Sequence, residues 1–230
     1  MSEPVLVAFT LAYAYLLGSV SSAYIVGRLV KGVDLRRVGA GSLGASNVYY
    51  NVGRFWIVPV GVFDLFVKGL TPAYLAMLLD LGIAVQAAAS MLVIVGHNWP
   101  LFLGFQGGRG VAPTVGVLIA LGRLELAYFI VLGAAGWQFT RASAVWVLLA
   151  FASLPLASLY FQRPAPIVLL MVGLLLVTVI KRLTANSVSG ASDDAGGVLR
   201  LLYNRLLFDR DIADHGDWVR QNADAPEARE

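Results

Sequence analysis

The chain contains no cysteine, only two histidines and few charged residues for its length. Of its 230 residues, 13% are charged and 58% are hydrophobic, whereas a soluble domain is about 25% charged. Without cysteine, disulfide bonds and thiolate metal sites are excluded. Two histidines are too few for a histidine-rich metal site, so we expect neither a metal nor a cofactor. Together with a mean hydropathy of +0.75, this composition indicates an integral membrane protein.

The few charges are unevenly distributed along the chain. Residues 1–180 contain ten Lys or Arg and five acids, a net charge of +5, whereas residues 181–230 contain seven Lys or Arg and nine acids, a net charge of −2. A basic excess within the hydrophobic part suits an anionic membrane surface or an anionic substrate. We therefore expect membrane lipids and small anionic molecules as partners, and no nucleic acid.

Long apolar runs follow one another along most of the chain. A membrane-spanning helix needs roughly 20 apolar residues, and fewer where neighbouring helices bury it. The first run is too long for the hydrophobic core of a signal peptide and is interpreted as a retained span. We therefore predict an all-α integral membrane protein with about seven transmembrane helices, at about residues 4–27, 55–79, 82–103, 111–121, 124–139, 143–161 and 165–180.

Basic residues between these runs orient the chain, because cytoplasmic loops are enriched in Lys and Arg. If the N-terminus is outside, the inside segments are residues 28–54, the glycine-rich loop before residue 111, the turn at Arg141 and the C-terminal tail. These segments hold five, one, one and seven basic residues, whereas the outside connections hold only Arg123 and Arg163. We predict a multi-pass protein of the cytoplasmic membrane, with the C-terminus and two glycine-rich loops on the cytoplasmic side.

The composition changes near residue 184, so we divide the chain into a membrane domain, residues 1–183, and a cytoplasmic tail. Residues 184–197 are rich in Ser, Gly, Ala and Asp, which predicts a flexible linker. Residues 198–208 are apolar with two arginines and predict a short amphipathic helix. This helix is expected either on the membrane surface or packed against the protein's own cytoplasmic face. The acidic end, up to residue 230, is predicted to be disordered.

One glycine-rich loop contains Gly107, Gly108, Arg109 and Gly110 in succession. A glycine run lets consecutive backbone N–H groups point into one concavity, and a guanidinium adds donors shaped for phosphate. The helix predicted from Val111 would direct its N-terminus to the same place. This pattern favours an anion-binding loop, and the alternative is a flexible turn in which Arg109 only sets the topology.

The second glycine-rich loop contains Gly39, Gly41 and Gly44, between Arg36 and Asn47. Its pattern matches the dinucleotide fingerprint G-x-G-x-x-G, but the strand and the βαβ unit that the fingerprint needs are missing from the predicted surroundings. What remains is a second group of backbone donors beside basic side chains. Two such loops on one membrane face indicate a ligand that carries phosphate, because irregular backbone at this depth is tolerated around a polar cavity.

Three further polar residues lie within or at the ends of apolar runs. Asp64 and Lys68 are four residues apart and share one helix face. Such charges are costly in a membrane unless they are paired or face the interior, so they form either a structural ion pair or a substrate contact through Lys68. His97, just before the first glycine-rich loop, is either a hydrogen-bonded interface residue or a functional group.

Several short motifs occur in a fixed order, and together they carry a family resemblance. They are Gly18-Ser19, Asp34-Leu35-Arg36 followed by residues 39–47, Asp64 to Gly69, and Gly96-His97 through Pro100 and Phe105 to Gly107-Gly108-Arg109-Gly110-Val111-Ala112. The order and spacing resemble the bacterial acyl-phosphate:glycerol-3-phosphate acyltransferase family, the PlsY type. The resemblance covers about residues 10–182.

The resemblance implies a seven-span enzyme of phospholipid biosynthesis that makes lysophosphatidic acid. It would transfer an acyl group from acyl phosphate to the 1-hydroxyl of glycerol 3-phosphate. Acyl phosphate is an activated anhydride, so the protein mainly positions two anions and neutralises the departing phosphate. We predict catalytic roles for His97, Arg109 and Ser42. The predicted substrate and phosphate contacts are Arg36, Gly39, Gly41, Gly44, Asn47, Lys68, Gly107, Gly108, Gly110 and Arg141.

The chain also departs from the family pattern. Ala40 stands where the family has a serine, Tyr50 where it has an arginine, and Arg109 where it has a lysine. The end of the last apolar run, Lys181-Arg182-Leu183-Thr184, lacks the histidine and the acid of the family. Ser42 or Ser46 could replace the missing serine.

These departures leave two other hypotheses open. One is a catalytically impaired relative that binds a phosphorylated lipid precursor or regulates a partner enzyme. The other is a small anion transporter or channel. Glycine-rich loops and seven spans are compatible with transport, but the sequence shows no internal symmetry of the kind common in transporters.

Overall fold

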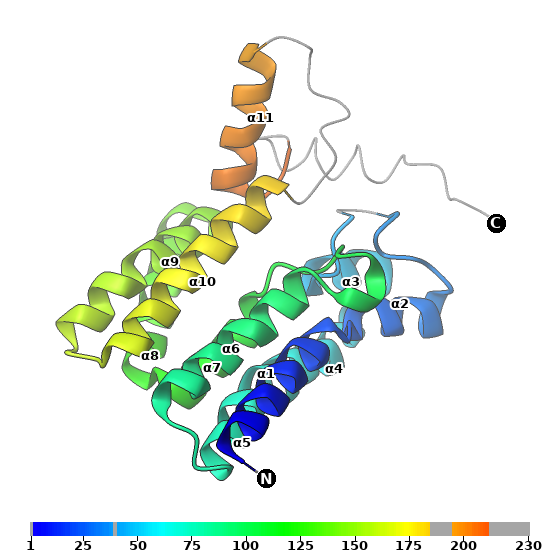
Figure 1. Ribbon diagram of the computed structural model, residues 1–230. Coiled ribbons are helices and arrows are strands. Elements are labelled where there is room, and N and C mark those ends of the chain that lie inside the picture. The colour runs from blue at the N-terminus through cyan, green and yellow to red at the C-terminus, as the bar shows by residue number, and fades with distance from the viewer. Residues whose placement is uncertain (1, 39–40, 185–194, 212–230) are drawn as a thin grey trace.

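The computed structural model describes residues 2–38, 41–184 and 195–211, and within these ranges the regular structure is helical. Figure 1 shows the helices as a bundle with the N-terminus at one end. The glycine-rich loops and α11 lie toward the other end. The α-helices are α1 (Glu3–Ser19), α2 (Ser22–Lys31), α3 (Ala45–Asn51), α4 (Ile57–Val62), α5 (Thr71–Leu78), α6 (Ile83–Asn98), α7 (Val111–Leu121), α8 (Arg123–Thr140), α9 (Ser143–Tyr160), α10 (Ala165–Thr184) and α11 (Ala195–Phe208).

Three shorter segments complete this architecture: the 3-10 turns η1 (Arg54–Trp56) and η3 (Leu101–Leu103), and the π-helical segment η2 (Phe63–Leu70). Segment η2 joins α4 to α5 without interruption. Among the described residues, four helical stretches are long and apolar enough to cross a membrane: Glu3–Lys31, Arg54–Leu78, Ser143–Tyr160 and Ala165–Thr184. The expected all-α architecture is therefore present.

The first apolar run, predicted as one span to about residue 27, lies within the apolar stretch Glu3–Lys31 but is broken in the middle. Helix α1 ends at Ser19, and Val20 and Ser21 are extended. The Ser21 hydroxyl accepts a hydrogen bond from the backbone N–H of Tyr24 at 3.2 Å. A serine in this conformation caps a new helix rather than continuing the old one. Helix α2 consequently leaves the direction of α1, as Figure 1 shows.

Small residues bring pairs of helices close together beneath the site. A Cβ atom on Gly18 of α1 would meet the backbone of α6, and one on Gly96 would meet the backbone of α1. Gly69 of η2 and Gly116 of α7 approach each other in the same way. Contacts between small residues are a common basis of helix association in membranes. They fix the C-terminal end of α6 and the N-terminal half of α7, which carry His97 and the first glycine-rich loop.

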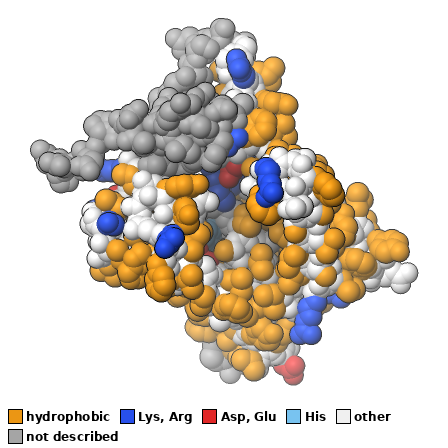
Figure 2. All heavy atoms as spheres, turned by 180° about the vertical axis from the view of Figure 1, so that it is seen from behind, with side chains coloured by type: hydrophobic (Ala, Val, Ile, Leu, Met, Phe, Trp, Pro, Cys, Tyr) orange, Lys and Arg blue, Asp and Glu red, His pale blue; other side chains and the backbone are white. Residues whose placement is uncertain are grey.

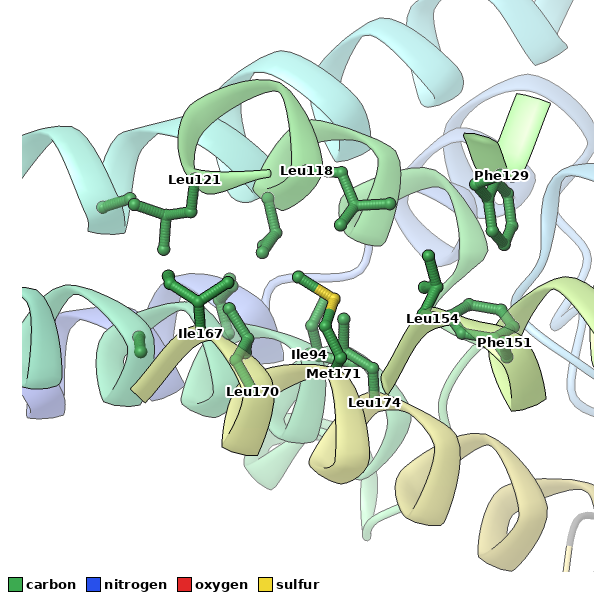
Figure 3. Packing of buried hydrophobic residues seen from close by; sticks show 14 of the residues in the cluster. Ile94, Leu118, Leu121, Phe129, Phe151, Leu154, Ile167, Leu170, Met171 and Leu174 are labelled. Atoms are coloured by element: carbon green, nitrogen blue, oxygen red, sulfur yellow. The ribbon is translucent and has the colours of Figure 1, made fainter. Parts of the chain in front are cut away.

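Buried hydrophobic side chains join α6–α10 into one core. Figure 3 shows Leu118 and Leu121 of α7 facing side chains of α10, with Phe129 and Phe151 together at one end. The last two rings meet edge to face at 5.1 Å between centroids. The larger side chains that α6, α9 and α10 add to this core include Ile94, Leu154, Ile167, Leu170, Met171 and Leu174. This core holds the end of α10 beside the end of α6.

An ion pair with a buried glutamate lies at the N-terminal end of α8. Glu125 is fully buried, and its carboxylate accepts hydrogen bonds from Ser158 at 2.8 Å and pairs with Arg163 at 3.2 Å. Arg163 also donates to the carbonyl of Leu121. Arg163 therefore connects α7 and α8 to the turn between α9 and α10. From the sequence it was predicted only as a charge in an outside connection.

Candidate functional site

The polar residues singled out from the sequence converge mainly at the end of the bundle that carries the glycine-rich loops. Figure 2 shows Lys, Arg and acidic side chains around a hollow in a mostly hydrophobic face. Two clusters can be distinguished by their contacts. The inner cluster consists of Ser22, Asp64, Lys68 and His97, and the outer cluster of Arg109, Lys181, Arg182 and Asp209.

The inner cluster is centred on a buried lysine. Lys68 is 1% exposed, and its Nζ lies 2.9 Å from Oδ1 of Asp64 and 3.2 Å from Nδ1 of His97. Ser22 at the start of α2 donates a hydrogen bond of 2.9 Å to the same carboxylate oxygen. The ion pair that the four-residue spacing predicts is therefore present. It lies on the π-helical segment, a distortion that is frequent at functional sites.

These contacts define how the His97 ring can act. An ammonium group only donates hydrogen bonds, so Nδ1 of His97 accepts from Lys68 and the ring proton resides on Nε2. We infer this tautomer from the hydrogen-bond partners. The Nε2 atom faces Gly108, where a Cβ atom would collide with it. In this arrangement His97 is a hydrogen-bond donor toward the glycine loop, and it is not a general base.

The first glycine-rich loop is packed beneath the end of α6. A Cβ atom on Gly107 would meet the carbonyls of His97 and Asn98. Gly110 has a left-handed backbone with a φ of 73° and precedes the first residue of α7. The N–H of Gly108 donates to the His97 carbonyl at 3.1 Å. The expectation of consecutive free N–H groups is therefore wrong at Gly108, because this N–H is used within the protein. The missing side chain at Gly108 instead leaves room for the imidazole of His97.

The outer cluster gathers three cations around one acid. Arg109 Nη1 donates to the Lys181 carbonyl at 3.2 Å, and its Nε lies 3.2 Å from Oδ1 of Asp209. Lys181 in turn donates to the carbonyl of Asn98 at 2.6 Å. Arg182 donates to two carbonyls, that of Ala144 and, in the tail, that of Leu206. Both charged residues at the end of α10 are almost fully buried, at 6% and 5% exposure.

Asn98 lies between the two clusters with a side chain that has no described partner. The residue is fully buried, and both amide atoms lack a hydrogen bond to the residues that the structure describes. Leaving a polar group unpaired costs about 1–3 kcal/mol, so such a group usually meets water or a ligand. Sequence analysis missed Asn98, Lys181, Arg182 and Asp209 as site residues. Asn98 directly follows His97, and Lys181 and Arg182 stand at the basic end of the last apolar run, whereas no sequence signal pointed to Asp209.

Asn47 organises the second glycine-rich loop from within. Its Nδ2 donates to the carbonyls of Leu35 at 2.8 Å and Ser42 at 2.9 Å, with a longer bond to Val38. Its Oδ1 accepts from Asn51 at 2.7 Å. The amide is thus used inside the protein, and the prediction that Asn47 contacts a substrate is corrected: it shapes the loop.

Arg36 is likewise committed to partners within the protein. It forms a two-pronged ion pair with Asp34, with a shortest distance of 2.6 Å, and donates to the Leu103 carbonyl at 3.2 Å. The hydrogen-bonded guanidinium lowers the pKa of Asp34 below its ordinary value of 3.8. Arg36 therefore fastens the second loop to η3, and the expected direct contact with substrate is not supported by its geometry.

Four further predicted site residues, Gly39, Gly41, Ser42 and Gly44, belong to the second glycine-rich loop. Gly39 lies outside the described residues. Gly41 has a positive φ of 62°, and Ser42 is half-buried close to Gly44. Leu43 links the loops through its N–H, which lies 3.5 Å from the Gly107 carbonyl. Ser42, Gly41 and Gly44 therefore stand beside the first loop.

Arg141 is not part of either cluster. It is exposed on the turn between α8 and α9, and its guanidinium lies over the ring of Trp137 at 4.6 Å from the centroid. A left-handed φ of 58° places it at the end of α8. The structure therefore does not bring Arg141 together with the other predicted phosphate contacts, and its role in binding stays a prediction.

The sequence matches proteins that share these motifs. The family model described as glycerol-3-phosphate acyltransferase matches residues 8–188. Glycerol-3-phosphate acyltransferase 4 of Dehalococcoides mccartyi is 35% identical over 217 residues, which cover 92% of each chain. Glycerol-3-phosphate acyltransferase 2 of Moorella thermoacetica is 41% identical over 160 residues, covering 69% of this chain and 81% of the relative.

The fold matches solved structures of the same kind. The crystal structure of PlsY, an integral membrane glycerol 3-phosphate acyltransferase in its glycerol 3-phosphate form, superimposes with a TM-score of 0.72 and 28% sequence identity. The match covers 87% of this chain and 94% of that one. The lysophosphatidic acid form of PlsY gives a TM-score of 0.70 with 26% identity.

Proposed function

Because this chain belongs to the glycerol-3-phosphate acyltransferase family, we propose that it is a membrane acyltransferase that makes lysophosphatidic acid for phospholipid biosynthesis. Its acyl acceptor would be glycerol 3-phosphate and its acyl donor acyl phosphate. The observation that carries this proposal is the arrangement of the two clusters. The donor His97 and the cations Arg109, Lys181 and Arg182 meet at one glycine-rich loop, where two phosphate groups could be neutralised.

The chemistry requires little from a protein base. The 1-hydroxyl oxygen of glycerol 3-phosphate attacks the acyl carbon, the bond from that carbon to the phosphate oxygen breaks, and the departing phosphate can take the hydroxyl proton. In this scheme Arg109 stabilises charge on a phosphate and His97 donates from Nε2. Lys68 and Asp64 hold the ring in that tautomer, so their role is both structural and functional. Catalysis then consists of positioning and electrostatics.

We also propose the topology that the loops imply. The seven spans would be α1, the stretch Arg54–Leu78, and α6–α10 in order, with the N-terminus outside and the C-terminus in the cytoplasm. The proximity of Leu43 to Gly107 supports a common side for both glycine-rich loops. Residues 1–183 would form the catalytic domain. For the tail helix, the hydrogen bond from Arg182 to Leu206 favours packing against the protein's own face.

An apolar groove of about 380 Å³ along α1 supports an acyl chain as part of the donor. Its lining includes Phe9, Tyr13, Leu16, Val20 and Phe102. The end at Val20 and Phe102 adjoins the site, because Leu101 donates a hydrogen bond to Ser19 at 3.2 Å. We assign this groove to the acyl chain.

Filling the groove should change the chain-length preference. Ala12 also lines it, so the A12W variant should lower the rate with palmitoyl phosphate about tenfold relative to octanoyl phosphate, because each excluded methylene loses burial. The matched control is A8W, on the exposed surface of the same helix. Equal rate ratios for wild type, A12W and A8W would place the acyl chain elsewhere.

A product assay tests the function itself. Purified protein in lipid nanodiscs is incubated with labelled palmitoyl phosphate and glycerol 3-phosphate, and lysophosphatidic acid and free phosphate are quantified together. We expect equal amounts of the two products, dependent on the acceptor. Binding of glycerol 3-phosphate without any acyl product would instead support the catalytically impaired relative. Among the described residues, Tyr50 favours that alternative, because its exposed ring stands where the family has an arginine.

A further inference from the structure

The outer cluster receives its acid from beyond the region that the family model matches. Asp209 directly follows α11, whereas the match ends at residue 188. Its Oδ1 nevertheless lies 3.2 Å from Nε of Arg109, and the two side chains are only 25% and 17% exposed. A residue of the tail thus contacts the arginine of the first glycine-rich loop.

Several hydrogen bonds hold this part of the tail in place. Arg182 donates to the Leu206 carbonyl at 2.7 Å, and Arg205 donates to the Leu183 carbonyl at 3.3 Å. Arg205 also forms an ion pair with Asp211 at 2.7 Å. The first two bonds join the end of α11 to the end of α10 just before Asp209, and the ion pair ties Asp211, just after Asp209, back to α11. The hydrogen bonds of α11 therefore hold the carboxylate of Asp209 in place.

The contacts of Arg109 leave part of its guanidinium for a ligand. Oδ1 of Asp209 forms an ion pair with Nε, and the Lys181 carbonyl accepts a hydrogen bond from Nη1. One ion pair and one hydrogen bond together restrict the orientation of this rigid group. The third nitrogen, Nη2, has no hydrogen bond to the residues that the structure describes, so it can donate to a phosphate. Arginine so anchored can meet an anion without first losing side-chain freedom.

The charge balance also agrees with an anchoring role. Arg109, Lys181 and Arg182 are three cations in a partly buried place, where like charges repel. One carboxylate reduces their sum to +2, which still complements a phosphate dianion. Burial raises the pKa of Asp209, while the neighbouring Arg109, Arg182 and Lys181 oppose that rise. The acid therefore relieves repulsion without neutralising the site.

We propose that Asp209 is a positioning residue that orients Arg109 toward the phosphate of the substrate, so that the tail segment 195–211 completes the site. This inference rests on the proposed function only in naming glycerol 3-phosphate as the ligand. The alternative is competition: if the carboxylate of Asp209 competed with phosphate for Arg109, it would inhibit substrate binding. The two roles predict changes of opposite sign when the carboxylate is removed.

The test measures binding and turnover of the full chain in nanodiscs. D209N should weaken the binding of glycerol 3-phosphate, measured by calorimetry, about tenfold, with a larger effect on KM than on kcat. D209E, which keeps a carboxylate, should recover most of this loss. The matched control is D80N, the same change at an exposed position with a left-handed φ of 57° that asparagine tolerates. It should bind like wild type.

A double-mutant cycle identifies the route of the effect. In the R109A background, D209N should cause no further loss, because residues that act together are not additive. Tighter binding or faster turnover in D209N would overturn the proposal in favour of competition. Unchanged binding, an equal loss in the R109A background, or failure of D209E to recover would also overturn it. Because the dissociation constant does not require turnover, absence of acyl transfer in wild type would count only against the proposed function.

Discussion

Replacing Lys68 with methionine is expected to lower the free energy of unfolding by about 3–5 kcal/mol and to abolish acyl transfer. Lys68 is buried between Asp64 and His97, at 2.9 and 3.2 Å. Without the ammonium group, the buried carboxylate of Asp64 keeps the hydroxyl of Ser22 as its hydrogen-bond partner among the described residues, with Nδ1 of His97 at 4.0 Å. The His97 ring also loses the donor that fixes its tautomer. Thermal unfolding of the purified variant, followed together with transfer activity, measures both losses.

The double variant D64N/K68M separates stability from function. Removing both charges avoids the uncompensated carboxylate, so we expect the unfolding temperature to return most of the way to that of wild type. Activity should stay absent, because the orientation of His97 is still lost. A folded double variant with wild-type activity would show that Lys68, Asp64 and the His97 tautomer have only a structural role.

The variant G108A should reduce kcat/KM by at least about 100-fold although it adds a single methyl group. A Cβ atom at this position would collide with Nε2 of His97 and lie 3.0 Å from the Leu43 carbonyl. The ring and the second glycine-rich loop must therefore both move. Displacement of about 1 Å at reacting groups is enough for a loss of this size. Steady-state kinetics of protein that elutes as wild type on size exclusion measures the effect.

A second glycine provides the matched control. Gly133 lies within α8, and a Cβ atom there meets nothing within 4 Å. G133A should leave activity unchanged and raise stability slightly, because alanine is the better helix former by about 1 kcal/mol. If G108A were as active as G133A, the close contact between the loop and His97 would not matter for catalysis, and the loop would be a simple turn.

The architecture of the membrane part could be predicted from the sequence because apolar runs directly indicate buried helices. The helices of the second half, such as α9 and α10, agree with the predicted runs within a few residues. The break after Ser19 could not be seen in the same way, because the serines on either side of Val20 are too few to interrupt the mean hydropathy of so long an apolar run. The break depends on the capping hydroxyl of Ser21, which competes locally with helix continuation, and a serine within an apolar run can equally bond within or between helices.

The site was predictable where contacts are local and not where they join distant segments. The pair Asp64 and Lys68 followed from helix spacing. The partner of Arg109 did not, because Asp209 is one hundred residues away in sequence and reaches it only through α11. Asn47 and Arg36 had been assigned to the ligand by residue type, but their hydrogen-bonding groups are used by nearby carbonyls and by Asp34. The type of a polar residue shows which hydrogen bonds it can form, but it does not show which group it will bind.

The most direct test compares kcat/KM for glycerol 3-phosphate, with palmitoyl phosphate as donor, in wild type, R109A and R141A. Both arginines were predicted from the sequence as site residues, but Arg109 belongs to the outer cluster and Arg141 stacks on Trp137 outside it. We predict lysophosphatidic acid from wild type, a loss of at least about 100-fold in R109A, and a change of no more than about twofold in R141A. Wild-type protein that binds glycerol 3-phosphate but forms no product, or R109A with wild-type activity, would contradict this account.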